Sequence, residues 1–159
     1  MNYTEVFKES PNKSRVLQPT GIVLHHSAGN FVGTESWILS PKSKVSYHCL
    51  VNTDGNRTIL VPDNKRAWHA GVSSFKGKQH CNNFLLGIAV TGNTGKRLLN
   101  EDEINSVAEW CVAKMKLYNF GIDRITTHRE ICPGRKADVD PRAEKSIKEM
   151  ILEMLNNNH

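Results

Sequence analysis

Two long amphipathic helical patterns stand among short, almost wholly apolar runs, and this arrangement constrains the fold more than any other feature of the sequence. The first pattern extends from Asn100 to Tyr118, with apolar residues at three- and four-residue steps and with Asn100 and Glu103 placed as a capping pair. The second begins near Pro141, which suits the first turn of a helix, and extends to Leu155. Each helix has one apolar side and therefore needs a surface to pack against.

The apolar runs supply that surface, because each has the composition of a buried β-strand. Asp54-Gly55 predicts a β-hairpin, since this dipeptide readily adopts the positive φ angles of a tight turn. Thr34 is expected to cap a short helix that ends at Leu39. Strands interspersed with helices predict an α/β fold with a central mixed β-sheet flanked by α-helices. The predicted strands are 21–25, 47–51, 58–61, 85–91 and 124–127.

Length and composition favour a single domain that spans residues 1–159. A chain of 159 residues can bury one hydrophobic core, and it contains no internal repeat, low-complexity tract or long Gly/Ser/Pro linker. No stretch approaches the roughly 20 apolar residues of a transmembrane helix, and the first twenty residues hold no apolar block of signal-peptide length. We therefore expect a monomer with no membrane insertion and no secretion signal.

The net charge of +5 favours an anionic partner, such as nucleic acid, anionic lipid or the acidic polymers of a bacterial envelope. The basic residues are scattered, and no helix-turn-helix, zinc-finger or RNA-binding signature is present, so we expect no nucleic-acid partner. The four cysteines form no C-x-x-C pair and are expected to be free thiols. They are Cys49, Cys81, Cys111 and Cys132.

Three polar clusters stand at the ends of predicted strands, at 24–28, 68–71 and 127–138. Strand ends are where open sheets usually place their functional sites. A catalytic zinc ion needs three protein ligands and one open position, and two imidazoles with a carboxylate make a common set. His25, His128 and Asp138 would provide such a set for one zinc ion per chain. Zinc would lower the pKa of its water toward about 7 and polarise a substrate carbonyl.

Two further residues could take part in hydrolysis. Lys136, two residues before Asp138, could offer its ammonium group to the oxyanion that forms when a carbonyl becomes tetrahedral. Tyr47, at the start of the predicted hairpin, could orient the attacking water or share in proton transfer. Spacing alone shows neither role, and both gain weight from a resemblance to a known family.

Five segments, in this order, resemble the type 2 N-acetylmuramoyl-L-alanine amidase family, which includes phage lysozyme-like amidases and peptidoglycan recognition proteins. The resemblance extends over about residues 21–155. The segments are Ile-Val-Leu-His-His-Ser-Ala at 22–28, Ser-Tyr-His-Cys-Leu-Val-Asn-Thr-Asp-Gly at 46–55, Trp-His-Ala-Gly at 68–71, Asn-Phe-Leu-Leu-Gly-Ile-Ala-Val at 83–90, and His128 with Pro-Gly-Arg-Lys-Ala-Asp at 133–138.

The resemblance implies a zinc-dependent amidase that hydrolyses the bond between N-acetylmuramic acid and L-alanine in peptidoglycan or muropeptides. It also implies two histidine ligands, an acidic third ligand, a catalytic lysine and a catalytic tyrosine. The residues that match these roles are His25, His128 and Asp138 for zinc, and Tyr47 and Lys136 for catalysis. Substrate contacts are expected at Trp68, His69 and Arg135.

The third ligand is the point where this chain departs from the family pattern. Many members read Lys-x-Asp-Pro or Lys-x-Cys-Pro, whereas this chain reads Lys-Ala-Asp-Val-Asp-Pro at 136–141. Asp138 has the expected distance from Lys136, and Asp140 has the expected proline after it. We prefer Asp138, because Asp140 is well placed to cap the last helix.

The biological setting has several candidates. A short, basic amidase with no separate wall-binding module and no signal is typical of a phage endolysin, which stays in the host cytoplasm until it is released to the cell wall and causes lysis. A bacterial amidase that recycles cytoplasmic muropeptides would share the same site, as would an exported antibacterial toxin. A binding module that holds peptidoglycan without cutting it is the main non-enzymatic alternative. A cysteine peptidase is disfavoured, since no cysteine lies at a predicted helix N-terminus.

Overall fold

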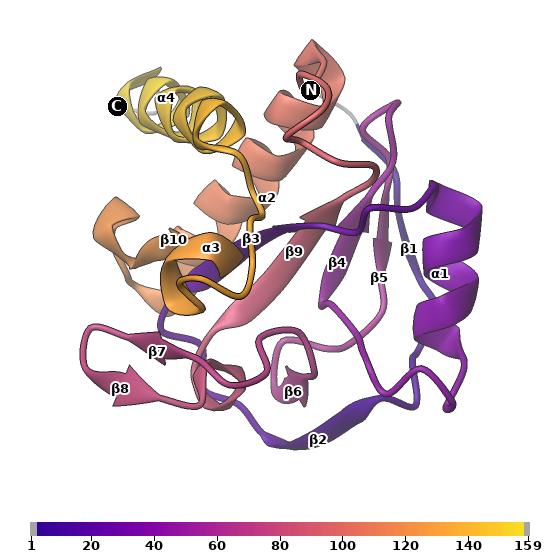
Figure 1. Cartoon of the computed structure of the whole chain (residues 1–159). Coiled ribbons are helices and arrows are strands. Elements are labelled where there is room, and N and C mark those ends of the chain that lie inside the picture. Colours follow the sequence, from indigo (N-terminus) through magenta and orange to yellow (C-terminus); the bar gives the residue numbers. More distant parts are fainter. Residues whose placement is uncertain (1–2, 158–159) are drawn as a thin grey trace.

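A six-stranded mixed β-sheet forms the centre of the protein in a computed structural model, which describes residues 3–157 (Figure 1). β4 and β5 pair antiparallel, and the other neighbours in the sheet are parallel. Helices cover both faces of the sheet, so the predicted α/β fold with a mixed sheet is confirmed. In spatial order the strands are β1 (Glu5–Phe7), β5 (Arg57–Ile59), β4 (Cys49–Val51), β9 (Leu86–Val90), β3 (Ile22–His26) and β10 (Ile125–Thr127).

The two faces of the sheet have different coverings, because successive side chains of a strand point in opposite directions. On one face Ile88 and its neighbours pack against α2 (Glu101–Tyr118) and α4 (Pro141–Asn157), the two long helices expected from the sequence. On the other face Leu50 and Ala89 pack against Ile38 of α1 (Phe31–Leu39). Figure 1 shows α2 and α4 side by side on one side of the sheet and α1 on the other.

The register of the parallel strands places two histidines together. Thr127 at the end of β10 pairs with Leu24 of β3, so the chain continues into His128 beside the position where β3 continues into His25. Parallel strands end at the same edge of a sheet, and this edge is where open α/β sheets usually place their sites. His25 pairs with Ala89 and therefore faces the same side of the sheet as α1.

The start of α1 differs from the prediction. Thr34 does not cap this helix; the cap is Asn30, whose side chain accepts a hydrogen bond of 2.7 Å from the backbone N–H of Gly33. Thr34 lies inside the helix, where its hydroxyl donates to the Ser27 hydroxyl at 3.0 Å. The side-chain oxygen of asparagine accepts hydrogen bonds from the free N–H groups of a first turn as well as that of threonine does. The observed cap therefore lies four residues before the predicted one.

Several short elements were not predicted, because they are polar or only two to four residues long. Among them, α3 contacts β3, β10 and β7, and Figure 1 shows α3 beside β10 with the β7–β8 hairpin below it. The four cysteines are free and buried, as expected. No helix within residues 3–157 is both long and apolar enough to cross a membrane. The additional elements are β1 (Glu5–Phe7), β2 (Lys13–Val16), β6 (Lys65–Ala67), β7 (Ser74–Phe75), β8 (Lys78–Gln79), η1 (Cys81–Asn83), η2 (Ile122–Arg124) and α3 (His128–Ile131).

Candidate metal centre

His25, His128 and Asp138 lie together, and the ligand atoms that they offer are all within 4.8 Å of one another. All three residues are buried. The two Nδ1 atoms are 3.1 Å apart, and the carboxylate oxygens of Asp138 lie 3.5 Å from His25 Nδ1 and 3.3 Å from His128 Nδ1. The three residues predicted as ligands are therefore brought together from positions up to 113 residues apart in the sequence.

The loop after α3 brings Asp138 to the two histidines. The backbone N–H of His26 donates to Asp138 Oδ2 at 3.2 Å, and the backbone N–H of Arg129 donates to the Asp138 carbonyl. Asp140 lies outside the cluster, because its Oδ1 accepts hydrogen bonds of 2.9 Å from both the backbone N–H and Nε of Arg142 in the first turn of α4. Of the two acidic candidates for the third position, the structure places Asp138 beside the histidines.

A backbone carbonyl determines which nitrogen of His128 carries the proton. His128 Nε2 lies 3.2 Å from the Ala70 carbonyl oxygen, which can only accept a hydrogen bond. Nε2 must therefore hold the proton in this contact, and Nδ1 of the neutral ring keeps its lone pair. That lone pair faces His25 and Asp138.

The same reasoning applies to His25 through a second ring. His69 Nε2 lies 3.1 Å from the Leu85 carbonyl oxygen and must donate to it, so Nδ1 of a neutral His69 is an acceptor. That acceptor lies 2.9 Å from His25 Nε2, which must then carry the proton of His25. His25 Nδ1 consequently keeps its lone pair and faces His128.

The cluster thus joins two nitrogen lone pairs and a carboxylate at a buried point with no proton donor between them. Burial lowers the pKa of His25 to about 4 and the pKa of His69 well below its usual range, so both rings are neutral near pH 7. The backbone N–H of His26 donates to Asp138 Oδ2, and a hydrogen bond of this kind favours the carboxylate form of the group. A cation removes the repulsion that these groups would otherwise have.

The donor set and its spacing fit zinc. Nitrogen and oxygen ligands at about 2.0–2.1 Å from a tetrahedral zinc ion are about 3.3–3.4 Å from each other. The separation of 3.1 Å between the two nitrogens is close to this value, as are those of 3.5 Å from His25 to Asp138 Oδ2 and of 3.3 Å from His128 to Asp138 Oδ1. With one ligand atom from each residue, all three atoms lie within 4.8 Å of one another. Two imidazoles and one carboxylate also leave a fourth position open, as in catalytic zinc sites.

Tyr47 and Lys136 border the cluster from different sides. The Tyr47 ring lies 5.0 Å from the His25 ring, measured between centroids. Burial, followed by the negative charge of Asp138, raises the pKa of the Tyr47 phenol, so its hydroxyl stays protonated near pH 7. Lys136 is exposed and lines a hollow that also contains His128 and His69.

This hollow, which we call the cationic hollow, has a volume of about 250 Å³. Three of its residues are lysine or arginine, and none is acidic. Trp68 lines it as well, and its Nε1 donates a hydrogen bond of 3.3 Å to the Ser14 hydroxyl, which fixes the indole ring. The lining residues are Lys44, Val45, Trp68, His69, Ala70, Gly71, Asn82, His128, Arg135 and Lys136.

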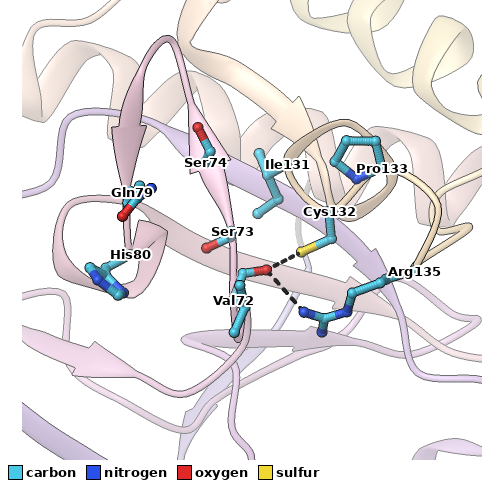
Figure 2. A pocket seen from close by; sticks show the side chains of 9 residues that line it. All are labelled: Val72, Ser73, Ser74, Gln79, His80, Ile131, Cys132, Pro133 and Arg135. Atoms are coloured by element: carbon cyan, nitrogen blue, oxygen red, sulfur yellow. Dashed lines mark hydrogen bonds between the residues drawn. The ribbon is translucent and has the colours of Figure 1, made fainter.

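Arg135 separates the cationic hollow from a neighbouring one of about 300 Å³, drawn in Figure 2. Figure 2 shows Arg135 and Cys132 directed at the same carbonyl oxygen, that of Val72. Arg135 Nη1 donates to it at 3.3 Å and the Cys132 thiol at 3.1 Å. One end of the guanidinium group is thereby fixed, while the side chain stays exposed.

His69 has a position that the sequence did not indicate. It lines the cationic hollow, where a substrate contact is expected, yet both of its ring nitrogens are engaged by His25 and by the Leu85 carbonyl. His25 and His69 are 44 residues apart in the sequence, and no spacing rule connects them. The contact by which His69 supports His25 is seen only in the folded structure.

Comparison with known proteins gives a family match and several sequence relatives. Residues 15–142 match the N-acetylmuramoyl-L-alanine amidase family. The chain is 39% identical over 98 residues to the 1,6-anhydro-N-acetylmuramyl-L-alanine amidase AmpD of Citrobacter freundii, an alignment that covers 62% of this chain and 52% of that protein. The chain thus spans about half the length of the curated relatives it matches.

Solved structures give the same fold. A selenomethionine derivative of AmpD superimposes with a TM-score of 0.78 and 27% identity, over 95% of this chain and 96% of that one. A mutant endolysin from Bacillus subtilis superimposes with a TM-score of 0.71, over 94% and 99% of the two chains. Its identity to this chain is 19%, so this second likeness concerns the fold alone.

Proposed function

Because the chain belongs to the N-acetylmuramoyl-L-alanine amidase family, we propose that it hydrolyses the amide bond between N-acetylmuramic acid and L-alanine with the help of one zinc ion. The observation that carries this proposal is the cluster of His25, His128 and Asp138, in which two carbonyl-determined lone pairs and a carboxylate converge. These three residues are the proposed ligands. A zinc ion bound there supplies the Lewis acidity that makes an amide carbonyl open to attack by water.

The remaining steps belong to residues of the chain itself. Lys136 is proposed to place its ammonium group near the carbonyl oxygen, where negative charge develops during the attack. Tyr47 keeps its proton near pH 7 and is proposed to donate a hydrogen bond to the reacting groups. Trp68 and Arg135 in the cationic hollow are proposed to contact the substrate, with Arg135 directed at a carboxylate of the peptide. His69 is proposed to act mainly by orienting His25.

For the substrate, we propose soluble muropeptides with a 1,6-anhydro sugar in preference to intact cell wall. Six sequence relatives at 36–41% identity carry this activity in their names, whereas the likeness to an endolysin concerns the fold, at 19% identity. This choice reverses the expectation of a phage enzyme that lyses its host and favours the recycling alternative. Residues 1–159 are proposed to act as one catalytic domain, since β1 near the start of the chain and β10 near its end belong to the same six-stranded sheet.

The test compares two substrates at equal concentrations of muramoyl-alanine bonds. Purified chain with zinc is given either a 1,6-anhydro-muramoyl tripeptide or intact peptidoglycan sacculi, and new L-alanine amino termini are counted. We expect release from the soluble compound at a rate at least ten times that from sacculi. Equal or faster release from sacculi would favour the endolysin role, and release from neither would contradict the amidase proposal. Asp138→Ala serves as the inactive variant and Asp140→Asn as its matched control.

A further inference from the structure

A second hollow borders the cluster on the side of Tyr47, and we call it the neutral hollow. Its volume is about 470 Å³, within the range of about 300–1,000 Å³ typical of small-molecule sites. None of its lining residues is charged, although the chain has 37 lysine, arginine, aspartate and glutamate residues in total. The lining residues are Ser27, Gly29, Asn30, Gly33, Thr34, Trp37, Ile38, Val45 and Tyr47.

Trp37 is the principal apolar surface in this hollow. Its side chain projects from α1, and 55% of the residue is exposed, which is unusual for so large an apolar group. Hydroxyl and amide groups of Ser27, Asn30 and Thr34 stand around it. An exposed aromatic face surrounded by a few polar, uncharged groups suits a ligand with both C–H faces and hydroxyl groups.

The neutral and cationic hollows meet at Val45, which lines both. Each also reaches the cluster: Tyr47 in the neutral hollow packs against the His25 ring, and His128 itself lines the cationic hollow. The cluster therefore has an uncharged approach on one side and an approach with three cationic side chains on the other. A substrate bound across the cluster would have to match both.

The substrate named in the proposed function has the same asymmetry. On one side of the scissile amide is a sugar ring with an acetamido group and no charge in its ring, and on the other is a peptide that carries carboxylates. The negative carboxylates of the peptide are attracted to the positive side chains of Lys44, Arg135 and Lys136. The neutral hollow has no charged side chain and offers no such attraction. The sugar then falls on the side of Trp37.

We propose that the neutral hollow is the sugar site, where an N-acetylated amino-sugar ring stacks on Trp37 while the peptide extends into the cationic hollow. This inference rests on the proposed function for the identity of the substrate. It gives the substrate a direction across the cluster, and it assigns Trp37 a role as a specificity-determining residue.

The test separates the two ends of the substrate. The rate constant kcat/KM is measured for a muramoyl tripeptide and for the same tripeptide acylated with D-lactate alone, which keeps the scissile amide and lacks the sugar. We expect Trp37→Ala to lower kcat/KM about tenfold for the muramoyl compound and by less than about twofold for the lactoyl compound. Trp37→Phe, which keeps an aromatic face, should lie between Trp37→Ala and the native chain. Phe7→Ala, at a residue with a similar exposed fraction of 56% but outside the hollow, should change neither value.

Equal losses on both substrates would mean that Trp37 contacts the peptide or the reacting groups, and no loss on either would mean that the hollow is not used. Both results would overturn the inference while leaving the amidase activity intact. A direct binding measurement covers the case in which the native chain hydrolyses neither compound. In saturation-transfer NMR with N-acetylmuramic acid and the full chain, the sugar protons should receive signal from the native chain and lose it with Trp37→Ala. Unchanged transfer with the variant, or none with the native chain, would also overturn the inference.

Discussion

At the scale of single residues, the chemistry of the cluster depends on side chains behind it. His25 keeps the lone pair of Nδ1 because its Nε2–H donates a hydrogen bond to His69 Nδ1. His69 Nδ1 can accept this bond because the proton of His69 is on Nε2, which donates to the Leu85 carbonyl. Gly87 makes room for this arrangement, because a Cβ atom there would lie 2.6 Å from Cγ of His69. The lone pair of His25 therefore depends on two residues that would not touch a metal.

We expect His69→Ala to weaken zinc binding by about 10- to 100-fold, since it removes the partner that fixes the His25 ring. Gly87→Ala should have a similar effect, because it displaces the same ring. Affinity is measured by competition with a fluorescent zinc chelator, which reports binding without relying on hydrolysis. His80→Asn, at an exposed histidine, is the control. Native affinity in both His69→Ala and Gly87→Ala would contradict this supporting role.

The buried side chain of His48 should make the free energy of unfolding depend on pH. Its Nε2 donates to the Lys65 carbonyl at 2.8 Å and its Nδ1 accepts from the Gly87 N–H at 3.0 Å, so the folded protein needs the neutral ring. Burial lowers the pKa of His48 to about 4, whereas an unfolded histidine has a pKa near 6.5. Between these values the unfolded chain binds the extra proton, so this contribution is complete above pH 6.5 and is lost as the pH falls toward 4.

Urea unfolding of the metal-free chain should therefore show a decreasing free energy of unfolding from pH 6.5 to 4.5. For His48→Gln, which cannot titrate, the slope should be smaller by up to about 1.4 kcal/mol per pH unit. A variant with the same slope as the native chain would show that His48 is not the group responsible. The comparison uses slopes rather than absolute values, because the substitution also changes the hydrogen bonds.

At the scale of helices and strands, the elements with strong apolar patterns were predictable. β9 and β3 are buried on both faces and read as continuous apolar runs, and α2 has the expected capping box of Asn100 and Glu103. β1 and β2 were not predictable, because these short strands carry exposed and partly buried side chains and take their shape from their neighbours. Two of the candidate ligands were found because His25 and His128 lie at the ends of predicted strands, and Asp138 was found through the resemblance of 133–138 to a family segment. The two hollows and the support of His25 by His69 arise only from tertiary contacts.

α4 provides a test of how this packing stabilises the sheet. Ile151 is fully buried in the core between α4 and α2, while its neighbour Leu152 is 46% exposed. We expect Ile151→Ala to lower the free energy of unfolding by about 2–5 kcal/mol and Leu152→Ala by less than about 1 kcal/mol. Urea unfolding gives both values. Similar losses for the two variants would contradict the arrangement of this helix on the sheet.

At the scale of the whole molecule, the carboxyl-terminal edge of the sheet concentrates the features that bear on function. The cluster and the cationic hollow are formed by residues at the ends of β3 and β10 and in loops, and the neutral hollow is formed by α1 together with loop residues beside it. The long helices α2 and α4 contribute to the core and not to these sites, because they pack on the opposite face of the sheet. The same fold is found in an AmpD derivative and in an endolysin, so the fold by itself does not determine the substrate, and the proposed preference for soluble muropeptides depends on the surface around the cluster.

We propose that one zinc ion in the cluster of His25, His128 and Asp138 enables the chain to hydrolyse the muramoyl-alanine amide. The most direct measurement is the initial rate of release of L-alanine amino termini from a 1,6-anhydro-muramoyl tripeptide by metal-depleted chain, titrated with zinc. From this proposal we expect no release without metal, a rise to a plateau at one zinc ion per chain, and no recovery for Asp138→Ala. Release that is unaffected by metal depletion, or none at saturating zinc, would contradict it.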